Sequence, residues 1–344
     1  MKNQADNKNM AIGVVGAGSW GTALSNLLAT KGYPVDLWVF EKEVRDQIQA
    51  CGENQVFLPG ITLSSRIFAT NDVARVASGK ALLVIVLPSH VFRKTVRRFK
   101  EHIAGDTVIV SASKGIEIKT HLTMSGVLSE ELPAMGPEHL AVLSGPTFAR
   151  EVAQNVPTVV TVAAANRQVA GWVQQVFASP FFRVYTGDDM LGVELGGAIK
   201  NVIAIAAGIA DGLGLGYNTR AALITRGLAE IRRLGVKLGA NPKTFSGLAG
   251  VGDLVLTCTG DLSRNYTVGK NIGKGKRLKE ILSEMRMVAE GIKTAKSVYE
   301  LSIRVGVEMP ISHEVYRILY HGLSPQKALR RLMARNLKQE LDEQ

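Results

Sequence analysis

Hydrophobic and polar positions follow a regular rhythm along the first half of the chain. Short runs rich in Val, Ile and Leu, such as AIGVV at 11–15 and ALLVIVLP at 81–88, alternate with longer stretches whose apolar residues recur at helical spacing. Further strand-like runs lie at 35–40, 107–113, 140–146, 157–164 and 181–185. Strands that alternate with helices of this length predict a parallel, doubly wound sheet.

The rhythm stops near residue 187. From 188 onward nearly every segment has helical spacing, interrupted by the stretches GLGLGYN, GANP, TCTGDLSRN, GKGK and VGVEMP. A chain of 344 residues has the length of about two domains. We therefore expect a sheet-containing domain at 1–187 and an all-helical domain at 188–344.

Composition narrows the class of protein. The two cysteines, Cys51 and Cys258, are far apart and form no CxxC motif, which disfavours a disulfide framework and fits a reducing cytosol. The polar start of the chain lacks the apolar region of a signal peptide. The apolar run at 202–210 lies between Lys200 and Asp211 and is too short to span a membrane. We expect a cytoplasmic protein without integral membrane association.

The net charge of +11 is compatible with nucleic acid, anionic lipid or an anionic small substrate. The basic residues form short clusters at 93–100, 274–279 and 330–338, each typical of a solvated face. Nucleic-acid binders usually concentrate their charge more strongly. The six histidines form no HxH or HExxH motif, so no metal site is predicted. An anionic small substrate is the favoured partner, and no nucleic acid is expected.

The stretch Gly16-Ala17-Gly18-Ser19-Trp20-Gly21 fits the pattern GxGxxG. It follows a predicted strand and opens a helix within a βαβ unit, which is the context of a dinucleotide-binding loop. Gly16 would permit the tight turn, Gly18 would let the backbone approach a pyrophosphate, and Gly21 would let the helix pack on the strand. A glycine-rich turn without a ligand stays open as the alternative.

The end of the second predicted strand bears on which dinucleotide binds. An acidic residue about 20 positions after the glycine loop binds the ribose 2′-hydroxyl of NAD, whereas a nearby Arg accepts the 2′-phosphate of NADP. The sequence there is Phe40-Glu41-Lys42-Glu43-Val44-Arg45. Glu41 favours NAD, while Lys42 and Arg45 leave NADP open.

Lys200 stands in GGAIKNVIAIAAGIADG, residues 196–212, among Ala, Ile, Val and Gly. Burying a lysine is costly, so this residue either extends out of an ordinary core helix or is held in a dry place for chemistry. Burial and a neighbouring cation lower the pKa of a lysine from about 10.4 towards the range useful for proton transfer. Gly196 and Gly197 are expected either to let the backbone approach a cofactor or substrate closely, or to be packing glycines between helices.

Four further stretches place polar or glycine-rich residues at the ends of apolar elements: SASKGIE, SGPTFARE, AGVGDLVLTCT and SRNYTVG. The first two follow predicted strands, where doubly wound folds place their ligand crevice. Lys114 of SASKGIE either lies in this crevice or caps a turn. Ser263, Arg264 and Asn265, in a predicted loop, offer donors suited to a phosphate, although a plain solvated loop would have a similar composition.

Nine motifs that run in order over almost the whole chain carry a resemblance to a known family: GAGSWGTAL, LPSH, SASKGIE, LSGPTFARE, LGGAIKNVIAIAAGIADGLG, TRGLAEI, GLAGVGDLVLTCTGDLSRN, VAEGIKTA and VEMPI. They closely resemble the bacterial, soluble, NAD(P)-dependent glycerol-3-phosphate dehydrogenases. The resemblance implies an α/β Rossmann-type domain followed by an all-α substrate domain. It also implies NAD(P)H as cofactor and interconversion of dihydroxyacetone phosphate and sn-glycerol 3-phosphate, which supplies phospholipid synthesis.

The resemblance further implies roles for single residues. Lys200 is similar to the catalytic acid/base of the family, and Lys114 to a second lysine shared by cofactor and substrate. The other positions similar to substrate contacts are Gly145, Thr147, Asp253, Ser263, Arg264 and Asn265. Those similar to cofactor contacts are Ser19, Trp20, Ala149, Arg264, Val288 and Glu290, in addition to Gly16, Gly18, Gly21, Phe40 and Glu41. Phe40 departs from the many bacterial members that carry His or Arg near this point.

The implied mechanism is direct hydride transfer to the C2 carbonyl, with Lys200 donating the proton and Lys114 polarising the carbonyl. Arg264 and Asn265 would anchor the phosphate, and Asp253 would orient Lys200 or a substrate hydroxyl. Three other functions stay open: a two-domain dehydrogenase for a hydroxy acid or sugar-acid phosphate, a dinucleotide sensor without catalysis, and a nucleic-acid-binding protein. Residues 324–341 could pack on their own domain or on a partner subunit, which leaves a homodimer open.

Overall fold

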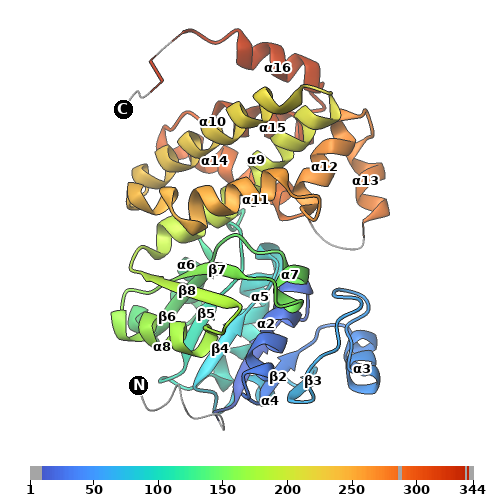
Figure 1. Cartoon of the computed structure of the whole chain (residues 1–344). Coiled ribbons are helices and arrows are strands. Elements are labelled where there is room, and N and C mark those ends of the chain that lie inside the picture. The colour runs from blue at the N-terminus through green and yellow to red at the C-terminus, as the bar shows by residue number, and fades with distance from the viewer. Residues whose placement is uncertain (1–9, 286–288, 338, 341–344) are drawn as a thin grey trace.

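An eight-stranded sheet forms the first part of the molecule (Figure 1). The computed structural model describes residues 10–285, 289–337 and 339–340. The strands lie in the order β3-β2-β1-β4-β5-β6-β7-β8. Their bounds are β1 Ile12–Val15, β2 Val35–Trp38, β3 Ile67–Thr70, β4 Leu82–Ile85, β5 Val108–Ser111, β6 Leu140–Ser144, β7 Thr158–Ala163 and β8 Phe182–Gly187. The first six follow the order of a doubly wound dinucleotide-binding sheet, which confirms the predicted fold class.

Two features of the sheet differ from the prediction. The strand β3 was not predicted. It is a four-residue strand at the edge of the sheet, in which Ile67 and Phe68 are not buried. The prediction of a wholly parallel sheet was wrong for one pair, since β7 runs antiparallel to β6. Between them the short helix α7, Ala149–Ala153, packs against α2. The chain therefore leaves β6 and enters β7 at the same end of the sheet.

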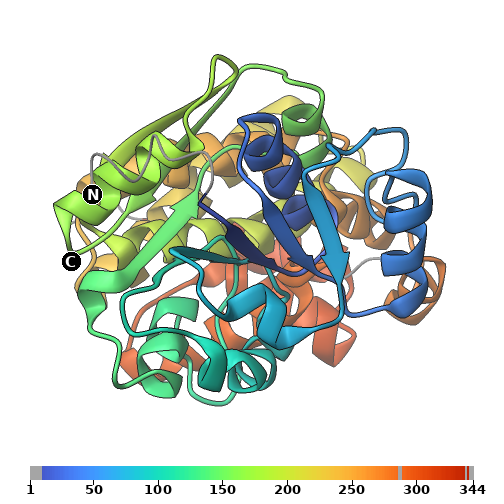
Figure 2. The ribbon, with the colours of Figure 1, turned by 90° about the horizontal axis from the view of Figure 1, so that it is seen from below.

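Helices cover both faces of the twisted sheet (Figure 2). Apolar residues of α2 and α8 form one hydrophobic core with the sheet, and those of α4, α5 and α6 form the other. The bounds of these helices are α2 Ser19–Thr30, α4 Val73–Ala77, α5 Ser89–Phe99, α6 Met124–Glu131 and α8 Arg167–Phe177. The helix α3, Lys42–Cys51, and the short turns η1, Lys100–His102, and η2, Pro137–His139, complete this part.

The second part is helical and lies at one end of the sheet (Figure 1). The long helix α9, Met190–Gly212, forms its core and packs against α10, α11, α12, α14 and α15. The remaining elements are α10 Gly216–Lys237, η3 Pro242–Ser246, η4 Leu248–Gly252, α11 Asp253–Thr259, α12 Arg264–Gly273, α13 Leu278–Glu284, α14 Glu290–Val305, α15 Pro310–His321 and α16 Pro325–Met333. The expected division into domains at 187 and 188 stays a prediction.

The helix α9 is longer than the apolar run at 202–210 suggested. Its length and composition would suffice to cross a membrane, and it is the one such helix in the described part of the chain. However, 94% of its apolar window is buried inside the protein. Its apolarity therefore follows from its place in the core, since core helices pass the same test.

Candidate active site

The glycine loop between β1 and α2 has the geometry that the pattern predicts. Gly16 has a φ of +114°, and a Cβ there would lie 2.3 Å from the Val86 carbonyl oxygen. A Cβ on Gly21 would lie 1.9 Å from the Gly16 carbonyl oxygen, so helix and loop pack too closely for a side chain. By contrast, a Cβ on Gly18 would meet nothing within 4 Å. The N-terminus of α2 is thus open at Gly18, where backbone amides can face a pyrophosphate.

Ser19 and Trp20 follow in the first turn of α2. The Ser19 hydroxyl donates to the Phe57 carbonyl oxygen at 2.6 Å, so part of its bonding is within the protein. The Trp20 Nε1 atom is buried and has no hydrogen-bond partner among the described residues. An open glycine turn beside an unpaired indole N–H fits a bound dinucleotide.

The end of β2 borders a hollow that contains both apolar and basic groups. Phe40 is 69% exposed, and Glu41 stands at the N-cap of α3 without a side-chain capping bond. The hollow is lined by Trp38, Val39, Phe40, Lys42, Asn71 and Arg98. Arg45 instead pairs with Asp46 and Asn71. Sequence reasoning missed Arg98 because this residue lies on α5, far from β2 in the sequence. With Glu41, Lys42 and Arg98 all near the end of β2, the charges are compatible with NAD and with NADP.

Lys200, Lys114 and Asp253 meet where the sheet joins the helical part. Lys200 Nζ donates to Asp253 Oδ1, and at 2.7 Å to the Thr257 hydroxyl. Lys114 Nζ donates to the other Asp253 oxygen, Oδ2, at 2.6 Å and to the Gly145 carbonyl oxygen at 3.2 Å. The Asp253 side chain is 0% exposed and that of Lys200 is 7% exposed, whereas that of Lys114 is 18% exposed. A single buried carboxylate therefore holds two lysines.

Burial lowers the pKa of Lys200 to about 7, with repulsion from Lys114 acting in the same direction and attraction to Asp253 opposing it. The nearby thiol of Cys258 has a pKa raised to about 12 by burial, so it is uncharged. An amine with a pKa close to neutrality can both give and take a proton. Lys200 on α9 is thus buried away from water and does not extend to solvent.

The glycines before Lys200 lie where other protein segments approach α9. A Cβ on Gly196 would lie 2.4 Å from the Ala249 carbonyl oxygen, and one on Gly197 would lie 2.7 Å from the Ser144 hydroxyl. Both glycines let protein segments approach α9, as the packing alternative predicts, whereas the expected approach of a ligand to them stays a prediction. The segments that they admit are η4, which leads into Asp253, and the end of β6, which leads into Gly145.

The SRN stretch was predicted to form a loop, but its residues begin the helix α12. Ser263 is the N-cap of α12, and its hydroxyl accepts from the Tyr266 amide at 3.2 Å. Asn265 is buried, donates to the Asn201 side chain and accepts from the Gly291 amide, both at 2.9 Å. Because Asn201 is next to Lys200 on α9, this network links the start of α12 to the lysine pair.

Glu290 begins α14 and contacts the sheet part. Ser89, at the start of α5, donates to Glu290 Oε2 at 2.7 Å, while Oε1 is buried without a hydrogen-bond partner among the described residues. Burial raises the pKa of Glu290, and the charges of Lys293 and Arg264 oppose this. Desolvation lowers the pKa of Arg264, with Glu290 opposing. The charges of Glu290 and Arg264 therefore attract each other.

The remaining predicted residues lie in three places. Thr147, after β6, donates to the Gly145 carbonyl oxygen at 3.3 Å, so it borders Lys114. Ala149 begins α7 and is half-buried against the core of the sheet part. Val288 lies outside the described residues. Within the described chain, no hydrogen bond or ion pair joins Phe40 or Glu41 to the lysine pair.

Three supporting residues were missed at the sequence level: Thr257, Asn201 and Ser89. Thr257 follows Asp253 by one helical turn, and Asn201 follows Lys200 directly, so both stood in motifs already considered. Ser89 belongs to LPSH, but nothing in the sequence paired it with a residue 201 positions away.

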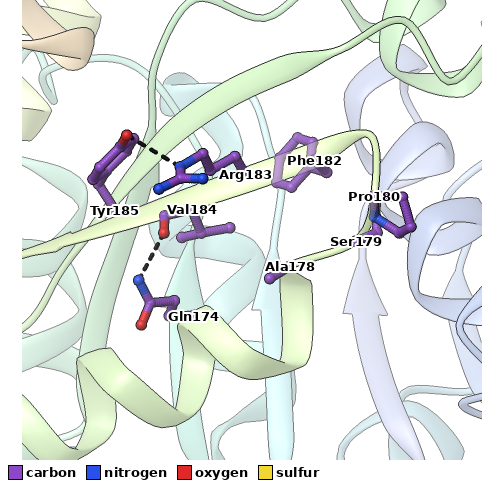
Figure 3. Close-up of a pocket in the computed structure, with 8 residues that line it drawn as sticks. All are labelled: Gln174, Ala178, Ser179, Pro180, Phe182, Arg183, Val184 and Tyr185. Carbon is purple, nitrogen blue, oxygen red and sulfur yellow. Dashed lines mark hydrogen bonds between the residues drawn. The ribbon is translucent and has the colours of Figure 1, made fainter.

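A separate hollow lies beside the edge strand β8 and α8 (Figure 3). Two of its polar side chains bond within the protein: Arg183 Nε donates to the Tyr185 hydroxyl at 3.1 Å, and Gln174 donates to the Val184 carbonyl oxygen at 2.7 Å. None of the predicted site residues lines it. We therefore place the candidate site at the lysine pair.

The protein combines an open glycine turn on a doubly wound sheet with a buried lysine whose pKa lies near neutrality. These features are typical of a dehydrogenase that uses a nicotinamide dinucleotide. Comparison with known proteins specifies the family. The model of the NAD-dependent glycerol-3-phosphate dehydrogenase N-terminus matches residues 11–170, and that of the C-terminus matches 189–330. The chain belongs to this family of NAD-dependent glycerol-3-phosphate dehydrogenases.

Individual relatives agree with the family models. The chain is 57% identical over 331 residues to a glycerol-3-phosphate dehydrogenase [NAD(P)+] of Syntrophobacter fumaroxidans, covering 96% of this chain and 97% of that one. It is 55% identical to the enzyme of that name from Geobacter sulfurreducens, covering 96% and 98%. A solved glycerol-3-phosphate dehydrogenase from Coxiella burnetii superimposes with a TM-score of 0.92 at 42% identity, covering 95% and 100%. The protein is accordingly an NAD(P)-dependent oxidoreductase of glycerol 3-phosphate.

Proposed function

We propose that Lys200 is the proton donor and acceptor in the interconversion of dihydroxyacetone phosphate and sn-glycerol 3-phosphate. The observation that carries this proposal is the buried cluster in which Lys200 and Lys114 share Asp253. The reduced nicotinamide, when bound, supplies a hydride to the C2 carbonyl carbon. Lys200 gives its proton to the oxygen on which negative charge develops, and Lys114 stabilises the same oxygen electrostatically.

Asp253 has two tasks in this proposal. Its carboxylate keeps the two ammonium groups close together, although their charges repel. It also orients Lys200 Nζ, together with the Thr257 hydroxyl. After Lys200 has given its proton, Asp253 and Lys114 remain as an ion pair, so the buried site is left without an uncompensated charge.

The dinucleotide is proposed to lie along the carboxyl end of the sheet. The amides at Gly18 and in the first turn of α2 would hold the pyrophosphate. Phe40 and Glu41 would border the adenosine, and Trp20, Lys114, Ala149, Arg264, Glu290 and Val288 complete the proposed cofactor contacts. The unpaired Trp20 Nε1 and Glu290 Oε1 atoms support this assignment, because buried polar atoms normally have partners.

The substrate phosphate is proposed to bind at the start of α12. The positive end of the helix dipole and the Arg264 guanidinium both favour an anion there. Ser263 and Asn265 already use much of their bonding within the protein. We therefore assign them mainly to shaping the phosphate site, with Gly145 and Thr147 bordering the rest of the substrate.

At the level of the cell, we propose that the enzyme works in the cytoplasm and supplies sn-glycerol 3-phosphate for phospholipid synthesis. A homodimer is a further proposal, and light scattering of the purified protein would test it. Both rest on the family to which the chain belongs.

The deciding experiment follows the absorbance of NADH or NADPH with dihydroxyacetone phosphate, for wild type, Lys200→Ala and Lys237→Ala. Loss of a positioned acid should lower kcat by about a hundredfold to ten-thousandfold in Lys200→Ala while the protein still binds cofactor. Lys237→Ala, at an exposed residue at the end of α10, provides the control and should leave the rate unchanged. A folded, cofactor-binding wild type without turnover would contradict the assignment and favour a sensor.

A further inference from the structure

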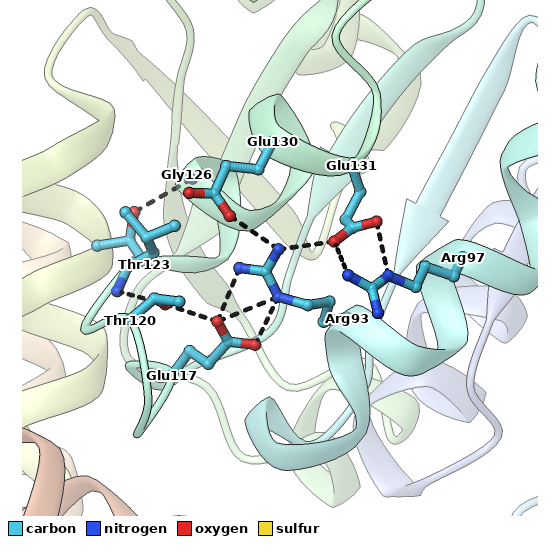
Figure 4. A network of polar contacts seen from close by, with 9 residues as sticks. Arg93, Arg97, Glu117, Thr120, Thr123, Gly126, Glu130 and Glu131 are labelled. Carbon is cyan, nitrogen blue, oxygen red and sulfur yellow. Dashed lines mark hydrogen bonds and ion pairs between the residues drawn. The ribbon is translucent and has the colours of Figure 1, made fainter.

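Arg93 lies among three carboxylates in the sheet part of the molecule (Figure 4). Its guanidinium donates from Nε and Nη2 to Glu117, over 2.8 to 3.1 Å, and from Nη1 to Glu131 at 2.6 Å. The Nη1 atom also lies 2.8 Å from Glu130 Oε2. The Arg93 and Glu117 side chains are only 18% and 16% exposed, so solvent screens this ion pair less than one at the open surface.

The pairing with Glu117 fixes geometry as well as charge. A planar guanidinium that donates two N–H groups to one carboxylate accepts only a narrow range of orientations. Hydrogen bonding from Arg93, with a contribution from Thr120, lowers the pKa of Glu117. Glu117 is therefore charged throughout the neutral range, and the pair persists at working pH.

Glu117 is the outer anchor of the segment that carries Lys114. This segment joins β5 to α6. The Glu117 amide donates to the Leu122 carbonyl oxygen at 2.9 Å and closes a turn. Between Lys114 and Glu117, Ile116 is buried, and its carbonyl oxygen accepts from the Ser297 hydroxyl at 3.0 Å. Gly115 has a φ of +157°, and a Cβ there would lie 2.5 Å from Ser89 Cβ, so the backbone has little room to move.

We propose that Arg93 is a positioning residue for Lys114: its paired contact with Glu117 fixes the β5–α6 segment so that Lys114 reaches Asp253 and the substrate. Arg93 belongs to none of the proposed cofactor or substrate contacts and acts through three residues of backbone. The inference rests on the proposed role of Lys114, which it deepens.

Movement of Lys114 would change the pKa of Lys200, which a purely structural role of Arg93 would not do. The groups facing Lys200 are Asp253 from α11, Lys114 from the β5–α6 segment and the uncharged Cys258 thiol. If Lys114 moves away, Lys200 loses a repelling charge and gains a larger share of Asp253. Both changes raise the pKa of Lys200, so the pH at which proton donation is lost moves upward.

The chain offers a matched control on the same helix. Arg97 also pairs with Glu131, with two hydrogen bonds of 2.8 Å, but makes no contact with Glu117. Its side chain is 61% exposed. Arg97→Ala thus removes a charge of the same sign from the same cluster and leaves the β5–α6 segment anchored.

The experiment measures kcat and KM from pH 6 to 9 for wild type, Arg93→Ala, Arg93→Lys and Arg97→Ala, with thermal unfolding of each. Misplacement of a catalytic group by about 1 Å costs up to about a hundredfold, so we expect Arg93→Ala to lose at least tenfold in kcat and to shift the pH profile upward. Arg93→Lys keeps the positive charge but cannot donate two N–H groups in the planar geometry of a guanidinium, so it should recover only part of the rate. Arg97→Ala should match wild type.

A second readout does not depend on turnover. Acetylation by an N-hydroxysuccinimide ester, followed by peptide mass spectrometry, should modify Lys114 at least threefold faster in Arg93→Ala than in wild type or Arg97→Ala, with Lys237 as the internal reference. If Arg93→Ala does not fold, Glu117→Gln decides by the same measurements. A wild type inactive on dihydroxyacetone phosphate would end the proposed function, and the labelling would still test the placement.

Two results would overturn the inference. The first is a folded Arg93→Ala with the wild-type pH profile and wild-type labelling of Lys114. The second is an equal change in Arg97→Ala, which would show that the cluster acts only by stabilising the sheet part.

Discussion

At Lys200 three ionisable groups share a space from which water is largely excluded. Two ammonium groups and one carboxylate would leave a net positive charge in a buried site, and burying such a charge is costly. The cost falls if one lysine gives up its proton, and Lys200 is the more buried of the two. The pKa of about 7 at Lys200 is the outcome of this competition.

The direction of the pH dependence follows from this pKa. Reduction of the ketone needs protonated Lys200, so its rate should fall as pH rises through about 7, the pKa of Lys200, while oxidation of the alcohol should rise. In Asp253→Asn the attraction that raises the pKa of Lys200 is lost, and the transition should move to lower pH. Initial rates in both directions between pH 5.5 and 9 measure the shift.

The control for this prediction is Asp261→Asn, an exposed residue in the turn before α12. It should leave the transition near pH 7, the pKa of Lys200. A transition in Asp253→Asn at the wild-type pH, or at a higher one, would show that another group titrates.

The sequence could single out Lys200 and the glycine loop, because both stand in patterns with a chemical meaning. It could not supply the pairing of the site residues. Lys114 and Asp253 are 139 positions apart, and nothing in the chain states that one carboxylate serves both lysines. The same holds for Arg93, which looked like part of a solvated basic face and is instead largely buried among carboxylates.

At the scale of elements, α9 and α12 pack with their backbones in close approach. A Cβ on Gly208 would lie 2.1 Å from the Tyr266 carbonyl oxygen, and one on Gly269 would lie 2.1 Å from the Ile205 carbonyl oxygen. Glycines from both helices thus face the opposite backbone. This contact sets the distance between Lys200 on α9 and Arg264 at the start of α12.

Gly269→Ala should therefore force the two helices apart. We expect a loss of about 1–3 kcal/mol in the free energy of unfolding, the usual cost of overpacking, and a higher KM for dihydroxyacetone phosphate. Gly171→Ala, in the interior of α8 where a Cβ would meet nothing within 4 Å, should stabilise by up to about 1 kcal/mol. Urea unfolding of both variants checks this, and equal stability changes would refute the packing argument.

The elements that sequence reasoning missed have weak or misleading local signals. The strand β3 has two unburied apolar residues, and its place at the sheet edge is set by pairing with β2. The SRN stretch was predicted as a loop from its polar composition, yet Ser263 is a favourable N-cap and starts a helix. The reversed direction of β7 depends on where α7 packs, which periodicity does not encode.

At the scale of the whole molecule, the two parts meet at the carboxyl ends of the strands. Lys114 and Asp253 form one link, and Ser89 and Glu290 form a second. A third is the contact of the buried Glu194 of α9 with the amide of Ser125 at 2.8 Å. The residues proposed for chemistry come from both parts, so the site exists only when these links hold the parts together.

The net charge of +11 acts at this same scale, since both substrate and cofactor are anions. A positive molecule raises the rate of encounter with anions, and salt screens this over a Debye length of about 10 Å at 0.1 M. We expect kcat/KM for dihydroxyacetone phosphate to fall several-fold between 0.05 and 0.5 M KCl, with kcat nearly constant, because the buried cluster of Lys200 and Asp253 is shielded from ions. Uncharged dihydroxyacetone as substrate should show little salt dependence of its own. If kcat fell instead while KM stayed constant, salt would be reaching the lysine pair, and the argument from burial would fail at the residue on which the chemistry depends.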